Sequence, residues 1–127
     1  MFGDIWIWAG IFRTTERNIG VVPYEIQPKL RILFDDVRYW IENKTFSQKE
    51  IALRFHHRLV QIHPFPNGNG RISRLMADLL MHQFGNNRLN WGSGNLVEIS
   101  ESRKRYIEAL QEADKGDYSK LLDFVGG

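Results

Sequence analysis

Two apolar patterns with helical spacing, separated by one short segment rich in Pro and Gly, constrain the fold of this chain most strongly. The first pattern follows Ser47 and Glu50, which form the Ser-x-x-Glu capping box of a helix N-terminus. Pro64 lacks an amide hydrogen and disfavours helical geometry in the residue before it, so we expect this helix to end at about Ile62. Its apolar stripe consists of Ile51, Ala52, Phe55, Leu59 and Ile62.

The second pattern predicts a helix that starts at about Gly70 and stops before Gly85, a natural C-terminal residue. A polar loop rich in Gly and Asn follows, over residues 85–95. The apolar positions of this helix are Ile72, Leu75, Met76, Leu79, Leu80 and Phe84. Two expected helices therefore flank one tight segment.

Three more helices are expected from the same spacing. The first runs from near Pro28 to around Asn43 and carries Leu30, Leu33, Phe34, Val37, Trp40 and Ile41. Another starts at Ser100 with Tyr106, Ile107, Leu110 and Ala113, and a short last helix covers Tyr118 to Val125. Between Arg13 and Gln27 the residues Thr14, Thr15, Ile19, Val21, Val22 and Tyr24 favour extended structure, as a loop or a small hairpin. The chain is therefore expected to be an all-α domain with one extended flap near the N-terminus.

The 127 residues suit a single domain of the commonest size. Met1 stands directly before an apolar stretch, so the protein is either unusually compact or lacks an N-terminal element. There are no cysteines, which excludes disulfides and thiolate chemistry and fits the cytoplasm. The apolar run from Ile5 to Phe12 is too short to cross a membrane, and no signal peptide precedes it. With 17 basic against 15 acidic residues, and no dense basic stripe, nucleic-acid binding is disfavoured.

The turn between the two central helices has the composition of an anion-binding site. Gly68 and Gly70 permit close approach of a ligand, and the amides of Gly68, Asn69 and Gly70 precede a helix, where unpaired N–H groups and the helix dipole attract anions. Arg71 and Arg74 lie on the first turn, where cations are electrostatically unfavourable unless an anion sits between them. A Gly-rich turn with solvated arginines is the competing interpretation. A polyphosphate ligand explains more of these residues.

His63 is the candidate general base, since a neutral imidazole beside a phosphate site can accept a proton from an attacking hydroxyl group. We expect Phe65 to turn inward and anchor the loop. His56, His57 and His82 are expected to be structural or bystander residues.

The string from His63 to Arg74, HPFPNGNGRISR, resembles the signature of the Fic (Fido) family, His-x-Phe-x-Asp/Glu-Gly-Asn-Gly-Arg-x-x-Arg. Trp8-Ala9-Gly10 with Arg13 resembles the element ahead of the flap in that family, and YIEAL at residues 106–110 resembles its later helix. NIGV at residues 18–21, together with HPFPNGNGR, is similar to the branch called mobile mystery protein B.

The resemblance implies a Fic-like helical bundle that transfers AMP from ATP to a Ser, Thr or Tyr hydroxyl of a target protein, as a toxin-like or regulatory enzyme. His63 would be the general base, and the amides of residues 68–70 with the side chain of Asn69 would hold the phosphates. Arg71 would contact the β-phosphate region and Arg74 the γ-phosphate, with Tyr106 near the base of the nucleotide. The flap, roughly Thr14 to Val22 and including Asn18, Ile19, Gly20 and Val21, would dock the target by adding a strand.

Asn67 departs from the family pattern, in which this position is acidic and holds the Mg²⁺ that bridges the phosphates. An amide keeps an oxygen ligand but removes its charge, and a charge pair at close range is worth roughly 4 kcal/mol before desolvation. We therefore expect Mg²⁺ with the ATP donor but a weaker hold on it by the protein. Three alternatives follow: the nucleotide holds most of the ion, the donor is a different molecule, or the enzyme is slow.

Two further alternatives follow from the same residues. One is a nucleotide-sensing or interaction module that binds phosphates with little or no turnover, and the other is transfer of a different nucleotide or phosphate-containing group. The Ser/Thr-x-x-x-Glu inhibitory helix of the family is matched poorly, by Ser119 and Asp123 followed by Phe124. Restraint would then come from a missing N-terminal part or from a separate antitoxin-like partner.

Overall fold

The computed structural model describes residues 20–65, 69–87, 89, 91 and 99–126. These residues form one short 3₁₀ helix and five α-helices: η2 (Pro23–Glu25), α2 (Ile26–Asn43), α3 (Gln48–Ile62), α4 (Asn69–Gln83), α5 (Ile99–Asp114) and α6 (Ser119–Gly126). The described part contains no strand, which confirms the all-α expectation. None of its helices is both long and apolar enough to span a membrane.

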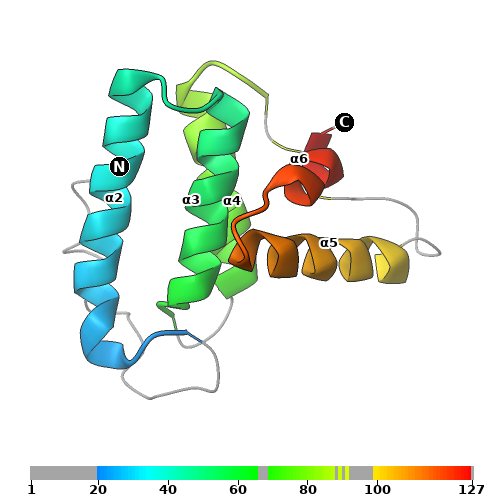
Figure 1. Cartoon of the computed structure of the whole chain (residues 1–127), viewed down its shortest axis with the longest axis horizontal. Coiled ribbons are helices and arrows are strands. Elements are labelled where there is room, and N and C mark those ends of the chain that lie inside the picture. Colours follow the sequence, from blue (N-terminus) through cyan, green and yellow to red (C-terminus); the bar gives the residue numbers. More distant parts are fainter. Residues whose placement is uncertain (1–19, 66–68, 88, 90, 92–98, 127) are drawn as a thin grey trace.

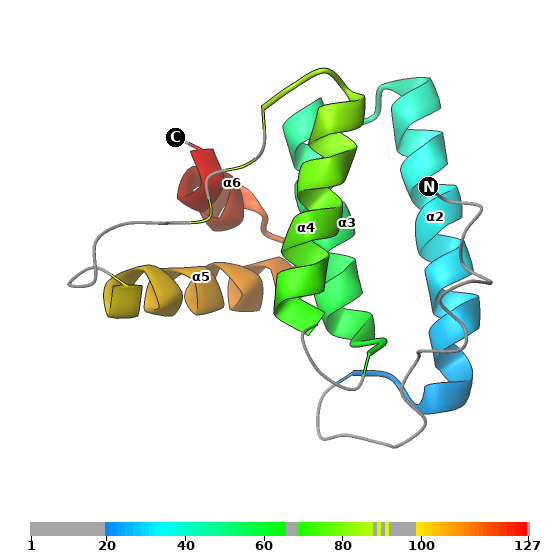
Figure 2. The same cartoon turned by 180° about the vertical axis from the view of Figure 1, so that it is seen from behind.

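Helices α2, α3 and α4 lie side by side, and α5 projects away from α3 and α4 on the side opposite α2, with α6 next to it (Figures 1 and 2). The core forms where α3 packs against α2 and α4, and it includes Leu33, Phe34, Phe55, Leu59 and Leu80. The tilted rings of Phe34 and Phe55, with centroids 6.1 Å apart, join α2 to α3. Burial of such side chains is the main stabilising contribution in a domain of this size.

Helix α2 starts two residues before the expected Pro28, because η2 leads directly into it. Proline is tolerated in the first helical turn, where its missing N–H would have no partner in the helix. Tyr24 and Gln27 are therefore helical, and the prediction that they belong to an extended flap is wrong. The end of α2 at Asn43 agrees with the prediction, and Lys44 closes it in a left-handed conformation.

The capping box before α3 is formed by Ser47, whose hydroxyl accepts a hydrogen bond from the N–H of Glu50 at 3.1 Å. The helix ends at Ile62, as Pro64 predicts. At the end of α4, Gly85 adopts a φ of +83°, a conformation that glycine reaches without strain.

The buried face of α4 differs from the predicted stripe. Leu75 and Leu79 are 56% and 43% exposed, whereas Ser73 and Ala77 are buried against α3. The small side chains at these two positions allow α3 and α4 to approach closely, and this rotates the larger leucines toward solvent. The prediction for Leu75 and Leu79 is therefore wrong, because apolar spacing alone did not weigh the size of the side chains.

Candidate active site

The turn between α3 and α4 begins with His63, whose φ of +53° is in the left-handed region. Its backbone N–H donates to the carbonyl of Leu59 at 3.0 Å and so closes the last turn of α3. The His63 side chain is half-buried. Phe65, two residues later, is buried, which confirms that it anchors the turn against the core.

Asn69 holds the shape of this turn. The N–H of Phe65 donates to Asn69 Oδ1 at 2.8 Å, and Asn69 Nδ2 donates to the carbonyl of Phe65 at 2.7 Å. The side chain is only 5% exposed. It therefore acts as a clamp inside the turn, and a contact between this side chain and phosphates stays a prediction.

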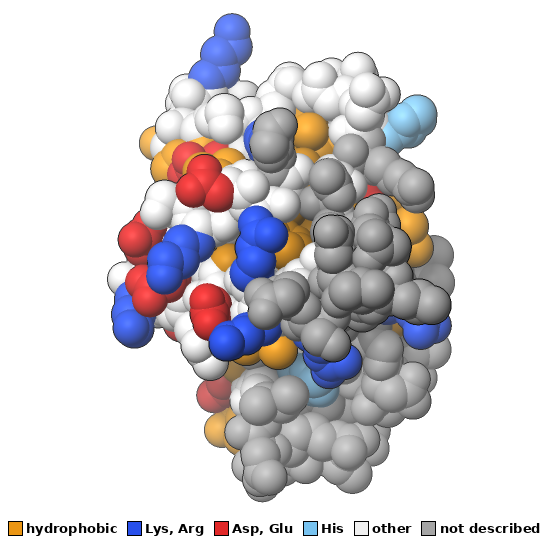
Figure 3. Space-filling view, turned by 90° about the vertical axis from the view of Figure 1, so that its right-hand side faces the viewer, with side chains coloured by type: hydrophobic (Ala, Val, Ile, Leu, Met, Phe, Trp, Pro, Cys, Tyr) orange, Lys and Arg blue, Asp and Glu red, His pale blue; other side chains and the backbone are white. Residues whose placement is uncertain are grey.

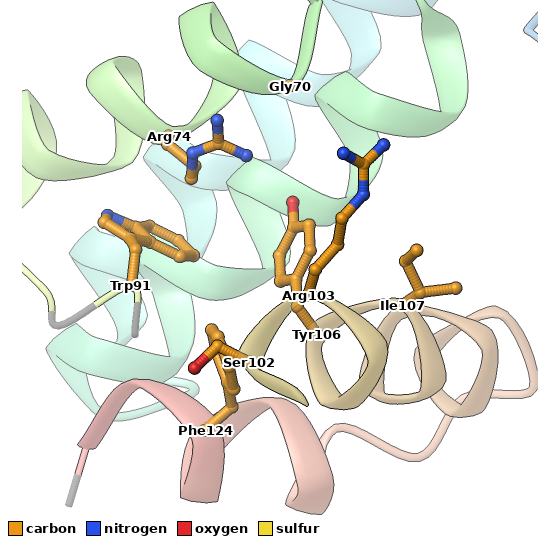
Figure 4. Close-up of a pocket in the computed structure, with 8 residues that line it drawn as sticks. All are labelled: Gly70, Arg74, Trp91, Ser102, Arg103, Tyr106, Ile107 and Phe124. Atoms are coloured by element: carbon orange, nitrogen blue, oxygen red, sulfur yellow. The ribbon is translucent and has the colours of Figure 1, made fainter. Parts of the chain in front are cut away.

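A pocket of about 480 Å³ opens beside the first turn of α4. This volume lies in the range of roughly 300–1,000 Å³ that is typical of small-molecule sites. The pocket is lined by residues from α4, α5, α6 and the segment after α4: Gly70, Arg74, Trp91, Ser102, Arg103, Tyr106, Ile107 and Phe124. Figure 4 shows that the polar ends of Arg74, Tyr106 and Arg103 point to the side where Gly70 lies, while Trp91 and Phe124 form an aromatic side.

The structure brings together three of the predicted site residues, Gly70, Arg74 and Tyr106, at this pocket. Arg71 is exposed, and neither it nor His63 is among the described residues that line the pocket. Of the two arginines, Arg74 lines the pocket, and the contact of both with phosphates stays a prediction. The positions of Asn67, Gly68, Asn18 and Ile19 lie outside the described residues.

The described end of the predicted flap is irregular. Gly20 is exposed with a φ of +87°. The N–H of Val21 donates to the carbonyl of Ile62 at 3.3 Å. This bond places the end of the flap segment beside the last residue of α3, one residue before His63.

Arg74 lies close to both Gly70 and Tyr106. A Cβ atom added at Gly70 would lie 3.4 Å from Arg74 Nη1, so glycine leaves room for the guanidinium group at the helix start. The guanidinium carbon is 5.8 Å from the centre of the Tyr106 ring. Burial raises the pKa of Tyr106, while the charge of Arg74 and its interaction with the hydroxyl act in the opposite direction. The hydroxyl group is therefore neutral and able to accept a hydrogen bond from Arg74.

The pocket wall at Trp91 depends on Asp78 of α4. The indole Nε1 donates to the two carboxylate oxygens of Asp78 at 3.0 and 3.2 Å, and the N–H of Leu89 donates to Asp78 Oδ1 at 3.0 Å. One carboxylate thus fastens the segment after α4 to the helix. Trp91 then packs against His56, with ring centroids 4.7 Å apart.

Several lining residues were missed by reasoning from the sequence. Arg103 and Ile107 follow one another at helical spacing with Tyr106 on α5, so their shared face was a usable signal. Trp91 comes from a segment with no periodic pattern, and Phe124 from α6, so the sequence carried no signal that they would meet. His56 was expected to be structural or a bystander, and its Nε2 lies 2.6 Å from the hydroxyl oxygen of Tyr106, a lining residue of the pocket.

Within the part of the chain that the structure describes, no group of three or more His, Asp or Glu side chains could hold a metal ion. The acidic residue of the weak inhibitory match, Asp123, is exposed, and its neighbour Phe124 lines the pocket instead. Ser119, the other residue of that match, donates its hydroxyl to Asp117 Oδ1 at 2.6 Å, which places it in the turn before α6.

Figure 3 shows the face toward which α5 and α6 project. Basic and acidic side chains lie next to one another there, with apolar surface between them. This mixture differs from the dense basic stripe of a general nucleic-acid-binding protein.

The chain is similar to one known protein family and to several known proteins. The model of the Fic/DOC family matches residues 2–81. The chain is 30% identical over 122 residues to the protein adenylyltransferase Fic of Aedes aegypti, which covers 94% of this chain and 23% of the relative. It is 31% identical over 120 residues to the protein adenylyltransferase fic-1 of Caenorhabditis briggsae, at 92% of this chain and 22% of the relative.

A solved structure of Fic-1 from C. elegans superposes with a TM-score of 0.70 at 29% identity. The superposition covers 91% of this chain and 32% of that one. The chain therefore spans about a quarter of the length of the relatives that it matches.

Proposed function

This chain belongs to the Fic/DOC family, and we propose that it transfers AMP from ATP to a hydroxyl group of another protein. The observation that carries the proposal is the pocket at the start of α4, in which Arg74 and the adjoining Gly70 backbone face the aromatic side chains of Trp91 and Phe124. A guanidinium group and helix N-terminal amides suit phosphates. Aromatic rings suit a nucleobase. The names of the relatives, which are protein adenylyltransferases, support AMP as the transferred group.

In the proposed reaction, the hydroxyl oxygen of the target attacks the α-phosphorus of ATP. A new phosphorus–oxygen bond forms as the bond to the oxygen that bridges the α- and β-phosphates breaks, and pyrophosphate leaves. His63 takes the proton of the hydroxyl group on its imidazole. Arg74 and the amides at the start of α4 stabilise the negative charge of the phosphates.

The backbone of His63 supports a role for its side chain. A non-glycine residue in the left-handed region is disfavoured, and this site at the end of α3 is one where glycine is common. Replacing His63 by glycine therefore suits the local backbone while removing the imidazole. The His63→Gly variant tests the catalytic role without the folding defect that a bulkier replacement risks.

Mg²⁺ is proposed to be held mainly by the ATP phosphates. Its chemistry would be to neutralise phosphate charge during transfer. The donor set of the described residues does not form a metal site, and the amide of Asn67 is a weaker ligand than the acid found at this place in the family. We expect the Asn67→Asp variant to reach half-maximal activity at a lower Mg²⁺ concentration than the wild type.

The proposal is tested by incubating the protein with a cell lysate and ATP labelled at the α- or the γ-phosphate. AMP transfer predicts protein labelled from the α position only, and no labelling by His63→Gly. Label from the γ position alone would show phosphate transfer instead. ATP binding by calorimetry without any transfer, together with transfer by Asn67→Asp, would support a nucleotide-sensing module. That second function is motivated by Asn67.

The restraint of this activity is proposed to come from outside the described residues. Because Asp123 points to solvent and Phe124 occupies the pocket side of α6, this chain offers no acidic partner for Arg74 from that helix. A separate antitoxin-like protein is one such partner. Co-expression with neighbouring genes, followed by the α-label assay, tests for it.

A further inference from the structure

Two adjacent buried histidines on α3 bind two tyrosines of the C-terminal helices. His56 Nε2 lies 2.6 Å from the hydroxyl oxygen of Tyr106 on α5. His57 Nδ1 lies 2.8 Å from the hydroxyl oxygen of Tyr118, just before α6, and His57 Nε2 lies 2.7 Å from Asp114 Oδ1. Both imidazoles are almost completely buried, at 0% and 2% exposed. The two pairs are therefore alike in residue type, element and depth.

The pairs differ in what lies beyond the tyrosine. Tyr106 lines the pocket beside Arg74, whereas Tyr118 packs against Arg54, whose guanidinium carbon is 4.3 Å from its ring centre. His56 also contacts a second lining residue, Trp91, and the rings of Trp91 and Tyr106 meet edge to face at 6.4 Å. His56 thus supports two walls of the pocket from beneath, while His57 fastens the turn between α5 and α6.

The chemistry of the three polar groups sets the direction of their hydrogen bonds. A guanidinium group can only donate, a phenol can donate one proton and accept others, and a neutral imidazole has one accepting nitrogen. The arrangement that fits these rules has Arg74 donating to the hydroxyl oxygen of Tyr106 and this hydroxyl donating to His56 Nε2, with the imidazole proton on Nδ1. Burial keeps His56 in the neutral form that this requires, and the charge of Arg74 acts in the same direction.

We propose that His56 is a positioning residue of the nucleotide pocket, which fixes the Tyr106 hydroxyl and through it orients Arg74 toward the phosphates of a nucleoside triphosphate. Without an acceptor at His56, the phenol proton has no partner on α3. The hydroxyl group then turns its proton toward the side of the pocket that Arg74 occupies. This inference rests on the proposed function, since it assigns a residue to the same site.

The test compares His56→Leu, which removes the acceptor, with His56→Gln, whose amide oxygen reaches a similar position and can accept the phenol proton. The readouts are the Kd for ATP with Mg²⁺ by calorimetry, and KM for ATP and kcat from α-label transfer. We expect His56→Leu to raise Kd and KM by about five- to tenfold, the equivalent of one lost hydrogen bond, with kcat within about twofold. His56→Gln should restore both values to within about twofold of the wild type.

His57→Leu is the matched control, because it removes an equally buried imidazole from the neighbouring position without touching the pocket. It should lower the thermal stability as His56→Leu does, but leave the Kd for ATP unchanged. If His56→Leu does not fold, Tyr106→Phe removes the same hydrogen bond while keeping both rings, and it should give the same rise in Kd. In the Tyr106→Phe background, His56→Gln should then have no further effect.

The proposal is overturned if His56→Leu and His57→Leu change the Kd for ATP equally, or if Tyr106→Phe leaves it unchanged. A failure of the proposed function would look different. In that case the wild type itself would neither bind ATP nor transfer label, and no pattern among the variants would arise.

Discussion

Acidification is expected to destabilise the fold through His56. Burial lowers the pKa of this histidine from 6.5 to about 4. Below about pH 6.5 the unfolded chain therefore binds a proton that the folded chain does not, so the free energy of unfolding falls as the pH falls toward 4. One pKa unit corresponds to about 1.36 kcal/mol, and the full difference amounts to roughly 3 kcal/mol. A domain whose total stability is of the order of 5–15 kcal/mol will show this clearly.

Urea unfolding at several pH values between 7 and 4.5, followed by far-ultraviolet circular dichroism, measures this dependence. The comparison is between the wild type and His56→Gln, which cannot take up the proton. Both proteins contain the same carboxyl groups, so the contribution of these groups to the free energy of unfolding cancels when the two proteins are compared. Hydrogen bonds from the side chain and backbone of Ser119 lower the pKa of Asp117, so its contribution is lost only below the ordinary carboxyl range. It therefore lies outside this window.

The stability of the wild type should fall steadily below pH 6.5, with a slope that approaches about 1.36 kcal/mol per pH unit, and that of His56→Gln should be flatter. A difference between the two proteins that stays constant from pH 7 to 4.5 would refute the assignment of a buried, neutral His56. In that outcome the phenol of Tyr106 would need a different partner, because His56 could not accept its proton.

Three further changes separate folding from binding. Asn69→Ala removes both bonds to the Phe65 backbone and should cost about 2–3 kcal/mol in urea unfolding, with weaker ATP binding; an unchanged midpoint would contradict the clamp. Gly70→Ala should keep or raise the melting temperature, since alanine favours helix by about 1 kcal/mol, but weaken ATP binding in calorimetry because its Cβ meets Arg74. Asp78→Ala should shift the tryptophan emission to longer wavelength and raise the Kd for ATP, since Trp91 loses its anchor; an unchanged spectrum and ATP titration would show that this wall is not needed.

The helices of this protein could be predicted from the sequence because their signals are local. Apolar spacing, the cap at Ser47, the stop at Pro64 and the glycine at residue 85 act within one or two turns, and each marks a helix end in the structure. The error at Leu75 arose where a neighbouring helix decides which face is buried. Local spacing carries no information on that choice.

The candidate site also combines residues that local signals identify with residues that only packing between helices brings together. Gly70 and Arg74, which both line the pocket, come from one contiguous motif, so the sequence could bring them together. The aromatic side comes from Trp91, in the segment after α4, and from Phe124 of α6, which meet only through tertiary packing. Hydrogen bonds across fifty or more residues set that packing, and a single sequence gives no sign of which histidine will meet which tyrosine.

His57 holds the turn between α5 and α6 and does not line the pocket. Its two ring nitrogens bind Asp114 at the end of α5 and Tyr118 at the start of α6, so one buried side chain holds both sides of the turn that contains Gly116. These two bonds hold the turn, whereas the bond from His56 reaches Tyr106 at the pocket. The hydrogen bond of His56 does not involve this turn, because its partner is Tyr106 in the pocket wall. The two neighbouring histidines therefore have different roles: His57 holds the turn between α5 and α6, and His56 is proposed to orient the guanidinium group of Arg74 through Tyr106.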